Sequence, residues 1–167
     1  MKKASEMKKG KCLVAIRIRG TPGVKSEFEN TLASLRLTRK FRAAILYDRL
    51  EITGMLARIK DLVTWGEARK ETLRLLLKER AQTIGGKKLT NSFVKQKFGL
   101  ATMDRLASAI DKGEIPLGRL WKKGLNPNFG LHPPKGGFKG KTKLAFKQGG
   151  ELGYRGEAIY NLIARMV

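Results

Sequence analysis

The chain has 167 residues, of which 41% are apolar, enough for one folded domain with a buried core. Thirty-six Lys and Arg residues against 14 Asp and Glu give a formal net charge of +22, which predicts a polyanionic partner and is rare among soluble metabolic enzymes. No stretch approaches the roughly 18–20 apolar residues of a membrane span, and one cysteine and one histidine exclude an internal disulfide and a Cys/His zinc cluster. We therefore expect a cytoplasmic protein without metal, cofactor, membrane contact or small-molecule substrate.

The N-terminal part begins with a lysine-rich stretch at 1–10, which predicts a basic arm. From 11 to 19, the apolar residues Val14, Ile16 and Ile18 alternate with small or basic ones. A period of two predicts a strand with one buried face and one basic face.

The next elements complete a β-α-β-α-β core over residues 11–66. Ser26 and Glu29 have the spacing of a capping box, so we expect a helix that starts there and stops near Arg36. Thr53 is a candidate cap for a second helix. Period-two and β-branched patterns predict the remaining strands at 41–47 and 63–65.

The pattern over residues 67–114 predicts a helical insertion. An amphipathic pattern covers 67–83, and a short helix near 91–97 follows, capped by Thr90 or Asn91. A third helix begins at Thr102 and ends before Gly113, a residue type common just after helices.

Residues 115–167 form a basic, Gly- and Pro-rich extension. The part from 115 to 150 has no acidic residue but eight Lys or Arg, eight Gly and four Pro. With few apolar anchors, it is expected to be largely mobile without a negative partner. A short strand is predicted around 142–146, and the chain closes with a helix whose apolar face docks on the core, comprising Ile159, Leu162, Ile163 and Met166.

The pattern of basic residues between aromatic ones favours RNA as the polyanion. Cations neutralise phosphates, planar side chains stack on unpaired bases, and Gly and Pro allow close backbone approach. Trp65 and Phe98 are interpreted as core residues, whereas Trp121 remains open between core and stacking roles. Basic residues gather near these aromatic rings in three groups: Arg39, Lys40 and Arg42; Arg119, Lys122 and Lys123; and Lys135, Lys139, Lys141 and Lys143, with His132 and Phe138.

Two other functions compete with RNA binding. The turn at 20–25 after a basic strand loosely resembles the phosphate loop of acylphosphatases, which would indicate an enzyme. A protein that coats DNA by charge alone is the second alternative. Against catalysis, the single histidine lies in an irregular basic segment, and Cys12 is best interpreted as a small buried side chain.

Several segments, in order, resemble one known family. The N-terminal motifs are Leu13-Val14-Ala15-Ile16-Arg17-Ile18-Arg19-Gly20, the stretch Thr31 to Arg39, Gly54-Met55-Leu56, and Val63-Thr64-Trp65-Gly66. The C-terminal motifs are Phe129-Gly130-Leu131-His132-Pro133-Pro134-Lys135-Gly136-Gly137-Phe138, Gly149 to Gly156, and Asn161 to Met166. Together they are similar to the L-thirty family of large-ribosomal-subunit proteins in its longer archaeal form, which is related to the eukaryotic protein called L-seven.

The resemblance implies an α+β fold: a small three-stranded antiparallel sheet with two helices on one face, related to the ferredoxin-like fold, plus the helical insertion and the basic extension. It implies a non-catalytic constituent of the large subunit that binds and stabilises folded rRNA, near the 5S rRNA, beside other ribosomal proteins.

The predicted RNA-binding residues combine the basic groups with positions carried over from the family. Gly54 and Met55 are included because we expect them at the start of a helix, where free backbone N–H groups meet phosphate. Gly130 stands where the family usually has Arg, so we expect the phosphate contact there either to be missing or to be supplied by Lys135 or Arg119. The full set is Arg17, Arg19, Arg36, Arg39, Lys40, Arg42, Gly54, Met55, Arg58, Arg119, Lys122, Lys123, His132, Pro133, Lys135, Phe138, Lys139, Lys141, Lys143, Tyr154 and Arg155.

Overall fold

The computed structural model describes residues 11–167, so the predicted arm at 1–10 lies outside the described residues. Its strands are β1 (Cys12–Arg17), β2 (Arg42–Tyr47), β3 (Val63–Glu67), β4 (Asn128–Gly130), β5 (Lys141–Ala145) and β6 (Gly150–Tyr154). Its α-helices are α1 (Ser26–Ser34), α2 (Leu50–Arg58), α3 (Lys70–Glu79), α4 (Asn91–Phe98), α5 (Met103–Asp111), α6 (Leu117–Lys122) and α7 (Ile159–Met166). Two 3-10 turns, η1 (Phe146–Gln148) and η2 (Gly156–Ala158), flank β6.

The strands form one sheet in the order β4-β2-β1-β3-β6-β5. β1 lies at the centre of an antiparallel trio, with Ala15 opposite Ala44 of β2 and Trp65 of β3. The returning chain adds β4 antiparallel to β2 and β6 parallel to β3. The predicted α+β fold with its three-stranded antiparallel sheet is confirmed, and the C-terminal extension enlarges this sheet to a mixed, six-stranded one by pairing with both edges.

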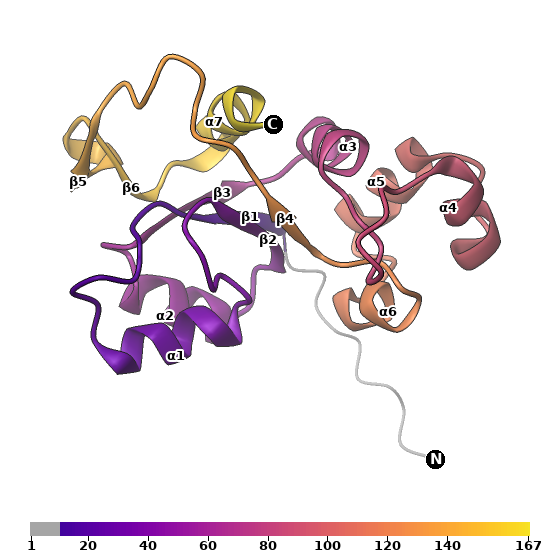
Figure 1. The fold of residues 1–167 in the computed structure, drawn as a ribbon, viewed down its shortest axis with the longest axis horizontal. Helices are drawn as coiled ribbons and strands as arrows, with labels where there is room; N and C mark the ends of the chain where they lie inside the picture. Colours follow the sequence, from indigo (N-terminus) through magenta and orange to yellow (C-terminus); the bar gives the residue numbers. More distant parts are fainter. Residues whose placement is uncertain (1–10) are drawn as a thin grey trace.

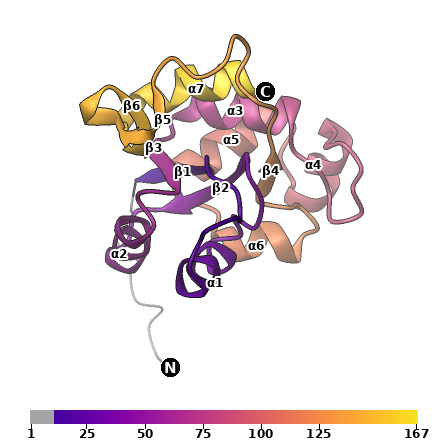
Figure 2. The ribbon, with the colours of Figure 1, turned by 60° about the vertical axis from the view of Figure 1, so that its left-hand side comes forward.

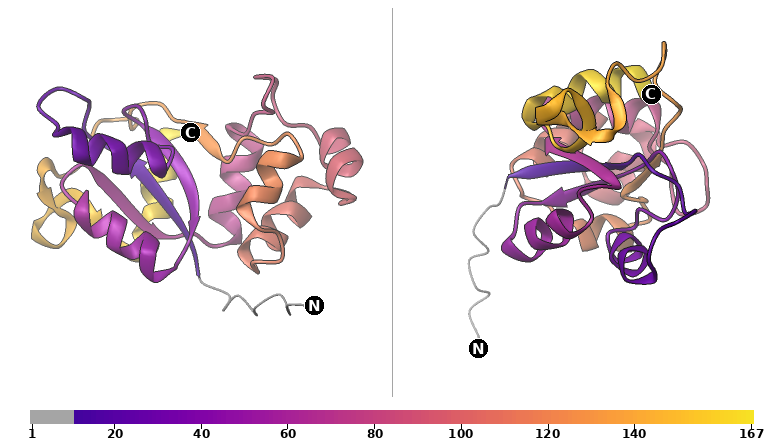
Figure 3. Two further views of the ribbon diagram at one scale, coloured as in Figure 1. Left: turned by 90° about the horizontal axis from the view of Figure 1, so that it is seen from below. Right: turned by 90° about the vertical axis from the view of Figure 1, so that its left-hand side faces the viewer.

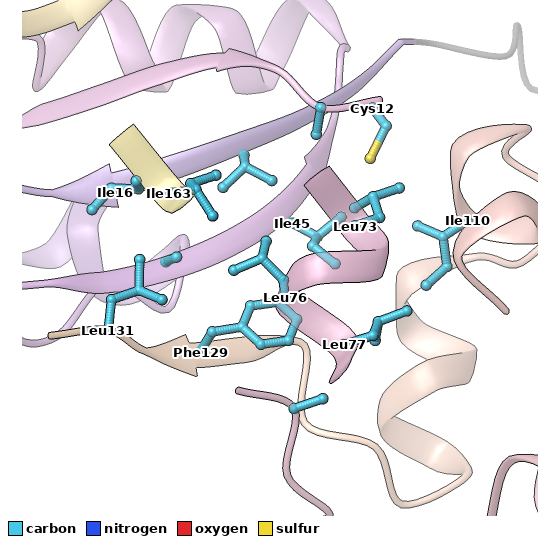
Figure 4. Packing of buried hydrophobic residues seen from close by; sticks show 14 of the residues in the cluster. Cys12, Ile16, Ile45, Leu73, Leu76, Leu77, Ile110, Phe129, Leu131 and Ile163 are labelled. Carbon is cyan, nitrogen blue, oxygen red and sulfur yellow. The ribbon is translucent and has the colours of Figure 1, made fainter. Parts of the chain in front are cut away.

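Helices cover both faces of this sheet (Figures 1 and 2). α1 and α2 lie together on one face, as the view from below in Figure 3 shows, and α3 and α7 lie on the other. Each face has its own buried cluster: Leu13 and Ala15 of β1 belong to the cluster with α1 and α2, whereas Val14 and Ile16 belong to the cluster with α3 and α7. Figure 4 shows part of this second cluster, including Ile16, Leu73 and Ile163.

The prediction that β1 has one buried face and one basic face is wrong. All six of its residues are buried, including Arg17. The insertion and the C-terminal helix supply the second cover, which a pattern read within the first 20 residues does not reveal. The docking of α7 is confirmed, since Ile159, Leu162, Ile163 and Met166 are all buried.

In the insertion the helices start where predicted, with Thr90 rather than Asn91 as the cap of α4 and Thr102 as the cap of α5, whereas the predicted caps in the core are not formed. The side-chain oxygens of Thr90 and Thr102 accept the N–H of Phe93 and Arg105, each at 3.3 Å. In contrast, α1 and α2 begin after Lys25 and Arg49 without a side-chain cap. α3 is shorter than the predicted 67–83 because β3 continues through Glu67.

The remaining differences follow from tertiary contacts. Glu29 binds Arg17 instead of closing a capping box, and Thr53 Oγ1 donates to Asp48 Oδ1 at 2.9 Å.

The stretch 115–150 holds more apolar anchors than expected. Leu120 of α6, Leu125, Phe129 of β4 and Leu131 are all buried in the cluster beneath α3. The expectation that this stretch has few apolar anchors is therefore wrong, because four of its scattered apolar side chains reach the core. Trp65 and Phe98 pack against the two clusters, which confirms their interpretation as core residues.

Candidate nucleic-acid interface

Two basic segments far apart in the sequence meet at one end of the sheet. Arg42 of β2 is paired with Gly130 of β4, and the Leu131 N–H donates to the Phe41 carbonyl at 3.0 Å. The rings of Phe41 and Phe138 lie 6.2 Å apart. We call residues 36–42 and 130–139 together the turn–tail surface.

The turn–tail surface carries cations without opposing carboxylates. Neither of its two segments contains an acidic residue. Within residues 11–167, no ion pair involves any of its basic side chains, Arg36, Arg39, Lys40, Arg42, Lys135 and Lys139. All of these are exposed except Arg42, which is partly buried. An unopposed positive field of this kind attracts a polyanion.

The turn has a backbone shape that ordinary residues rarely adopt. Arg36 and Phe41 have φ angles of 61° and 62°, in the left-handed region that disfavours residues with a side chain. Hydrogen bonds fix both ends: Leu37 N–H donates to the Leu32 carbonyl at 2.8 Å, and Phe41 N–H donates to the Arg17 carbonyl at 2.7 Å. Non-glycine residues persist in this region when the surroundings determine the backbone, as they do here.

The tail is held by the C-terminal end of α7. The His132 N–H donates to the Met166 carbonyl at 2.8 Å, and the Lys135 N–H donates to the Arg165 carbonyl at 2.9 Å. The Arg165 guanidinium donates to the carbonyls of Lys135, at 2.9 Å, and Gly137. The side chains of His132, Pro133 and Lys135 stay exposed. Arg165 therefore positions the tail, a role that sequence reasoning missed because it depends on a contact across 30 residues.

α6 extends the basic surface beside the turn. The Arg36 guanidinium lies 4.5 Å from the centre of the Trp121 ring, and Asn128 Nδ2 donates to the Arg36 carbonyl at 2.8 Å. Arg119 and Lys122 are exposed on the same helix. The Lys123 ammonium lies over the Phe98 ring at 5.3 Å. The predicted groups around Trp121 and Arg39 are thus neighbours in space.

Two predicted contacts are buried parts of the fold instead. Arg17 is fully buried, and its guanidinium donates to both oxygens of Glu29, at 2.6 and 3.1 Å, and to the Leu37 carbonyl at 3.0 Å. Arg155 is 8% exposed and donates to the Glu151 carboxylate at 2.8 Å and to Thr64 Oγ1 at 2.8 Å. Neither guanidinium has surface to offer RNA, because charged residues of these types are buried only where they are paired.

The expectation that Gly54 and Met55 lie at the start of a helix is also wrong. α2 starts at Leu50, and the Thr53 N–H already donates to the Arg49 carbonyl at 2.9 Å. Both residues therefore lie inside the helix, where the backbone N–H groups bond to the preceding turn. Arg58, in the last turn of α2, is exposed but pairs with Glu27 at 3.0 Å.

The other predicted residues lie elsewhere on the sheet. Arg19 is exposed just after β1, and Lys141 and Lys143 are exposed on β5, at the sheet edge opposite β4. Figure 1 shows the chain running from β4 past α7 to β5. Tyr154 lies at the far end of β6, where its hydroxyl donates to Glu67 Oε1 at 3.3 Å. Burial and the neighbouring Glu67 raise the pKa of Tyr154.

The described residues offer little for catalysis. Cys12 is buried, and burial raises the pKa of its thiol to about 12, so the nucleophilic thiolate is disfavoured. The segment 20–25 connects β1 to α1 as an ordinary turn, with the Val24 N–H donating to the Thr21 carbonyl. Within residues 11–167, no three His, Cys, Asp or Glu side chains gather as metal ligands, and no helix is long and apolar enough to span a membrane.

Comparison with known proteins identifies the family. A model of the ribosomal protein L30p/L7e family matches residues 13–63. The large ribosomal subunit protein uL30 of Ignicoccus hospitalis is 43% identical over 159 residues, covering 94% of this chain and 98% of that protein. The chain belongs to the L30p/L7e family.

Further relatives cover nearly the whole chain, well beyond the part that the L30p/L7e model matches. The uL30 proteins of Hyperthermus butylicus and Staphylothermus marinus are 44% and 45% identical, covering 99% and 91% of this chain and 96% of each relative. The insertion and the basic extension therefore belong to the L30p/L7e proteins of these organisms too, which confirms the resemblance drawn from the motifs.

Proposed function

We propose that this protein is a structural constituent of the large ribosomal subunit that binds and stabilises folded rRNA without catalysis. The observation that carries this function is the turn–tail surface, a fixed and unopposed group of cations in a chain of the L30p/L7e family. Its location would be the cytoplasmic ribosome, beside rRNA and other ribosomal proteins.

The binding mode follows from the geometry. The exposed cations neutralise phosphates, while the turn and the tail present a backbone shape already fixed by β4 and α7, so little conformational freedom is given up on binding. The residues proposed to contact RNA are Arg19, Arg36, Arg39, Lys40, Arg42, Arg119, Lys122, Lys123, His132, Pro133, Lys135, Phe138, Lys139, Lys141 and Lys143. The partly buried Phe138 contacts Phe41 and supports the surface as well.

The test is a titration of deproteinised large-subunit rRNA at several salt concentrations. A triple variant, Arg39→Ala, Lys40→Ala and Lys135→Ala, is compared with a charge-matched control, Lys60→Ala, Lys78→Ala and Lys112→Ala. The six residues are all exposed, but the control positions lie outside the turn–tail surface.

The first variant is expected to bind more weakly and to lower the salt slope by about one unit for each phosphate that it no longer neutralises. The control should retain most of the affinity. Equal weakening in both variants, or equal binding of duplex DNA at matched salt, would show that total charge and not this surface determines binding.

We further propose a contact with the 5S rRNA, which the family resemblance implies. Its structural support is that the lysines of β5 lie at the sheet edge opposite β4, where the tail begins, so the basic residues of one chain reach both edges of the sheet and can address two RNA segments. Lys141→Ala with Lys143→Ala should weaken binding to 5S rRNA together with large-subunit rRNA more than binding to large-subunit rRNA alone. An identical decrease in affinity for both RNA preparations would contradict this contact.

A further inference from the structure

Arg36, at one end of the turn–tail surface, contacts Trp121 of α6, and this pair has no evident part in the fold. Trp121 is 41% exposed and belongs to neither buried cluster, whereas its neighbour Leu120 is fully buried and holds α6 to the core. A large, half-exposed ring with little packing role needs a reason to be at the surface, since tryptophan gains most from burial.

The pair is fixed before any ligand binds. The guanidinium lies 4.5 Å from the ring centre, within the range of a cation–π contact. The Arg36 backbone is held in its left-handed conformation by the Asn128 amide on its carbonyl and by its own N–H on the Ala33 carbonyl at 2.9 Å. Two planar groups from different parts of the chain are therefore already in contact.

A groove adjoins the pair on the side of Arg36. Its volume is about 150 Å³, and Leu35, Arg36, Leu117, Gly118 and Asn128 are among its lining residues. Leu117 and Gly118 precede Trp121 by four and three positions, which places them on the same face of α6. Most of the side chains that line this groove are apolar, which suits the edge of a planar ring.

We propose that Arg36 and Trp121 form a stacking site for an unpaired nucleobase of the rRNA, which rests on the proposed function. Bases stack on tryptophan rings and on guanidinium planes. Arg119 and Lys122, exposed on the same short helix, are placed to hold the flanking phosphates. The pair thus contacts one unstacked base, whereas the other cations of the turn–tail surface bind the RNA backbone.

The first experiment separates stacking from charge. Trp121→Leu removes the aromatic plane without changing charge, Trp121→Phe retains a plane, and Lys122→Ala on the same helix removes a charge alone. Trp121→Leu is expected to bind large-subunit rRNA roughly 5- to 150-fold more weakly, the range for removal of one stacked base. Its salt slope should be unchanged, whereas Lys122→Ala should lower the slope by about one unit. Trp121→Phe should restore most of the affinity.

The second experiment observes the ring directly. The chain has two tryptophans, so Trp65→Phe leaves Trp121 as the sole tryptophan emitter. Saturable quenching of its fluorescence by rRNA is expected. Thermal unfolding of the free variants must match that of the parent, so that a loss of fold is not mistaken for a loss of stacking.

Different failures are distinguishable. If the unmutated protein does not bind rRNA, the proposed function fails and this site with it. If it binds but Trp121→Leu binds equally well without quenching in the reporter protein, only the stacking site is wrong. If Trp121→Leu binds rRNA normally yet enters assembled subunits less, the pair contacts a neighbouring protein, and the nucleobase site is overturned.

Discussion

Arg17 gives the clearest separation between a residue that builds the interface and one that touches RNA. The sequence predicts an RNA contact at this position, but the guanidinium is fully buried and links β1 to α1 through Glu29 and to the turn through the Leu37 carbonyl. We predict that Arg17→Met destabilises the protein strongly while leaving the number of phosphate contacts unchanged.

The magnitude follows from what the substitution leaves behind. Breaking a buried ion pair by removing one partner costs about 3–5 kcal/mol. The Glu29 side chain is 28% exposed and can regain water, which favours the lower end of that range. Methionine keeps the unbranched stem in place, so the cavity term is small. We therefore expect a destabilisation of about 3 kcal/mol, or a fall of about 6–12 °C in Tm for a chain of this length.

The assay pairs thermal unfolding with rRNA titration well below both midpoints, with Arg39→Ala as the matched control. Arg17→Met should lower Tm and keep the salt slope, whereas the exposed Arg39→Ala should keep Tm and lower the slope by about one unit. Adding Glu29→Gln to Arg17→Met should recover part of the stability, because the unpaired carboxylate is removed. A wild-type Tm together with a reduced slope in Arg17→Met would refute the reasoning.

Four further substitutions test other features of the molecule. Gly130→Arg, opposite Arg42 in an open position, should fold normally and raise the salt slope of rRNA binding by about one unit; an unchanged slope would mean that no phosphate lies there. Gly54→Ala, inside α2, should stabilise the folded protein by about 1 kcal/mol without affecting RNA affinity. Gly66→Ala should destabilise it by about 1–3 kcal/mol or more, because the new Cβ would lie 2.0 Å from the Gly156 carbonyl oxygen. Denaturant titration measures both changes, and weaker RNA binding by Gly54→Ala would contradict the position of Gly54 inside the helix. Burial raises the pKa of the Cys12 thiol to about 12, so the contribution of the neutral thiol to stability is complete below about pH 9. It is lost as pH rises toward 12, by up to about 1.4 kcal/mol per pH unit. The free energy of unfolding of Cys12→Ala should therefore decline less steeply between pH 8 and 10.5 than that of the parent, and parallel curves would contradict this.

Local patterns are sufficient where a local cause fixes the structure. The caps at Thr90 and Thr102 and the apolar face of α7 depend on residues three or four positions apart, and the structure has them as predicted. Period-two and helical spacings of apolar residues likewise predict the order of the core elements, because the antiparallel trio is built from neighbouring segments of the chain.

Contacts between distant segments account for the rest. Whether Arg17 faces water depends on Glu29 and on the turn at Leu37, and the cover over the second face of β1 comes from α3 and α7. The groups around Arg39 and Trp121 are separate in the sequence, yet only the fold shows that they adjoin each other through Arg36. Arg165 gives no signal in the sequence, since its role is a pair of hydrogen bonds to tail carbonyls.

The most direct test of the central claim is ultraviolet cross-linking of RNA within native large ribosomal subunits, followed by mass spectrometry of the cross-linked peptides of this protein. If the turn–tail surface and α6 bind rRNA, cross-links are expected in residues 36–42, 117–123 and 130–139. Cross-links confined to the opposite end of the sheet, around Lys11, Asp48 and Glu67, or absence of the protein from salt-washed large subunits, would contradict it.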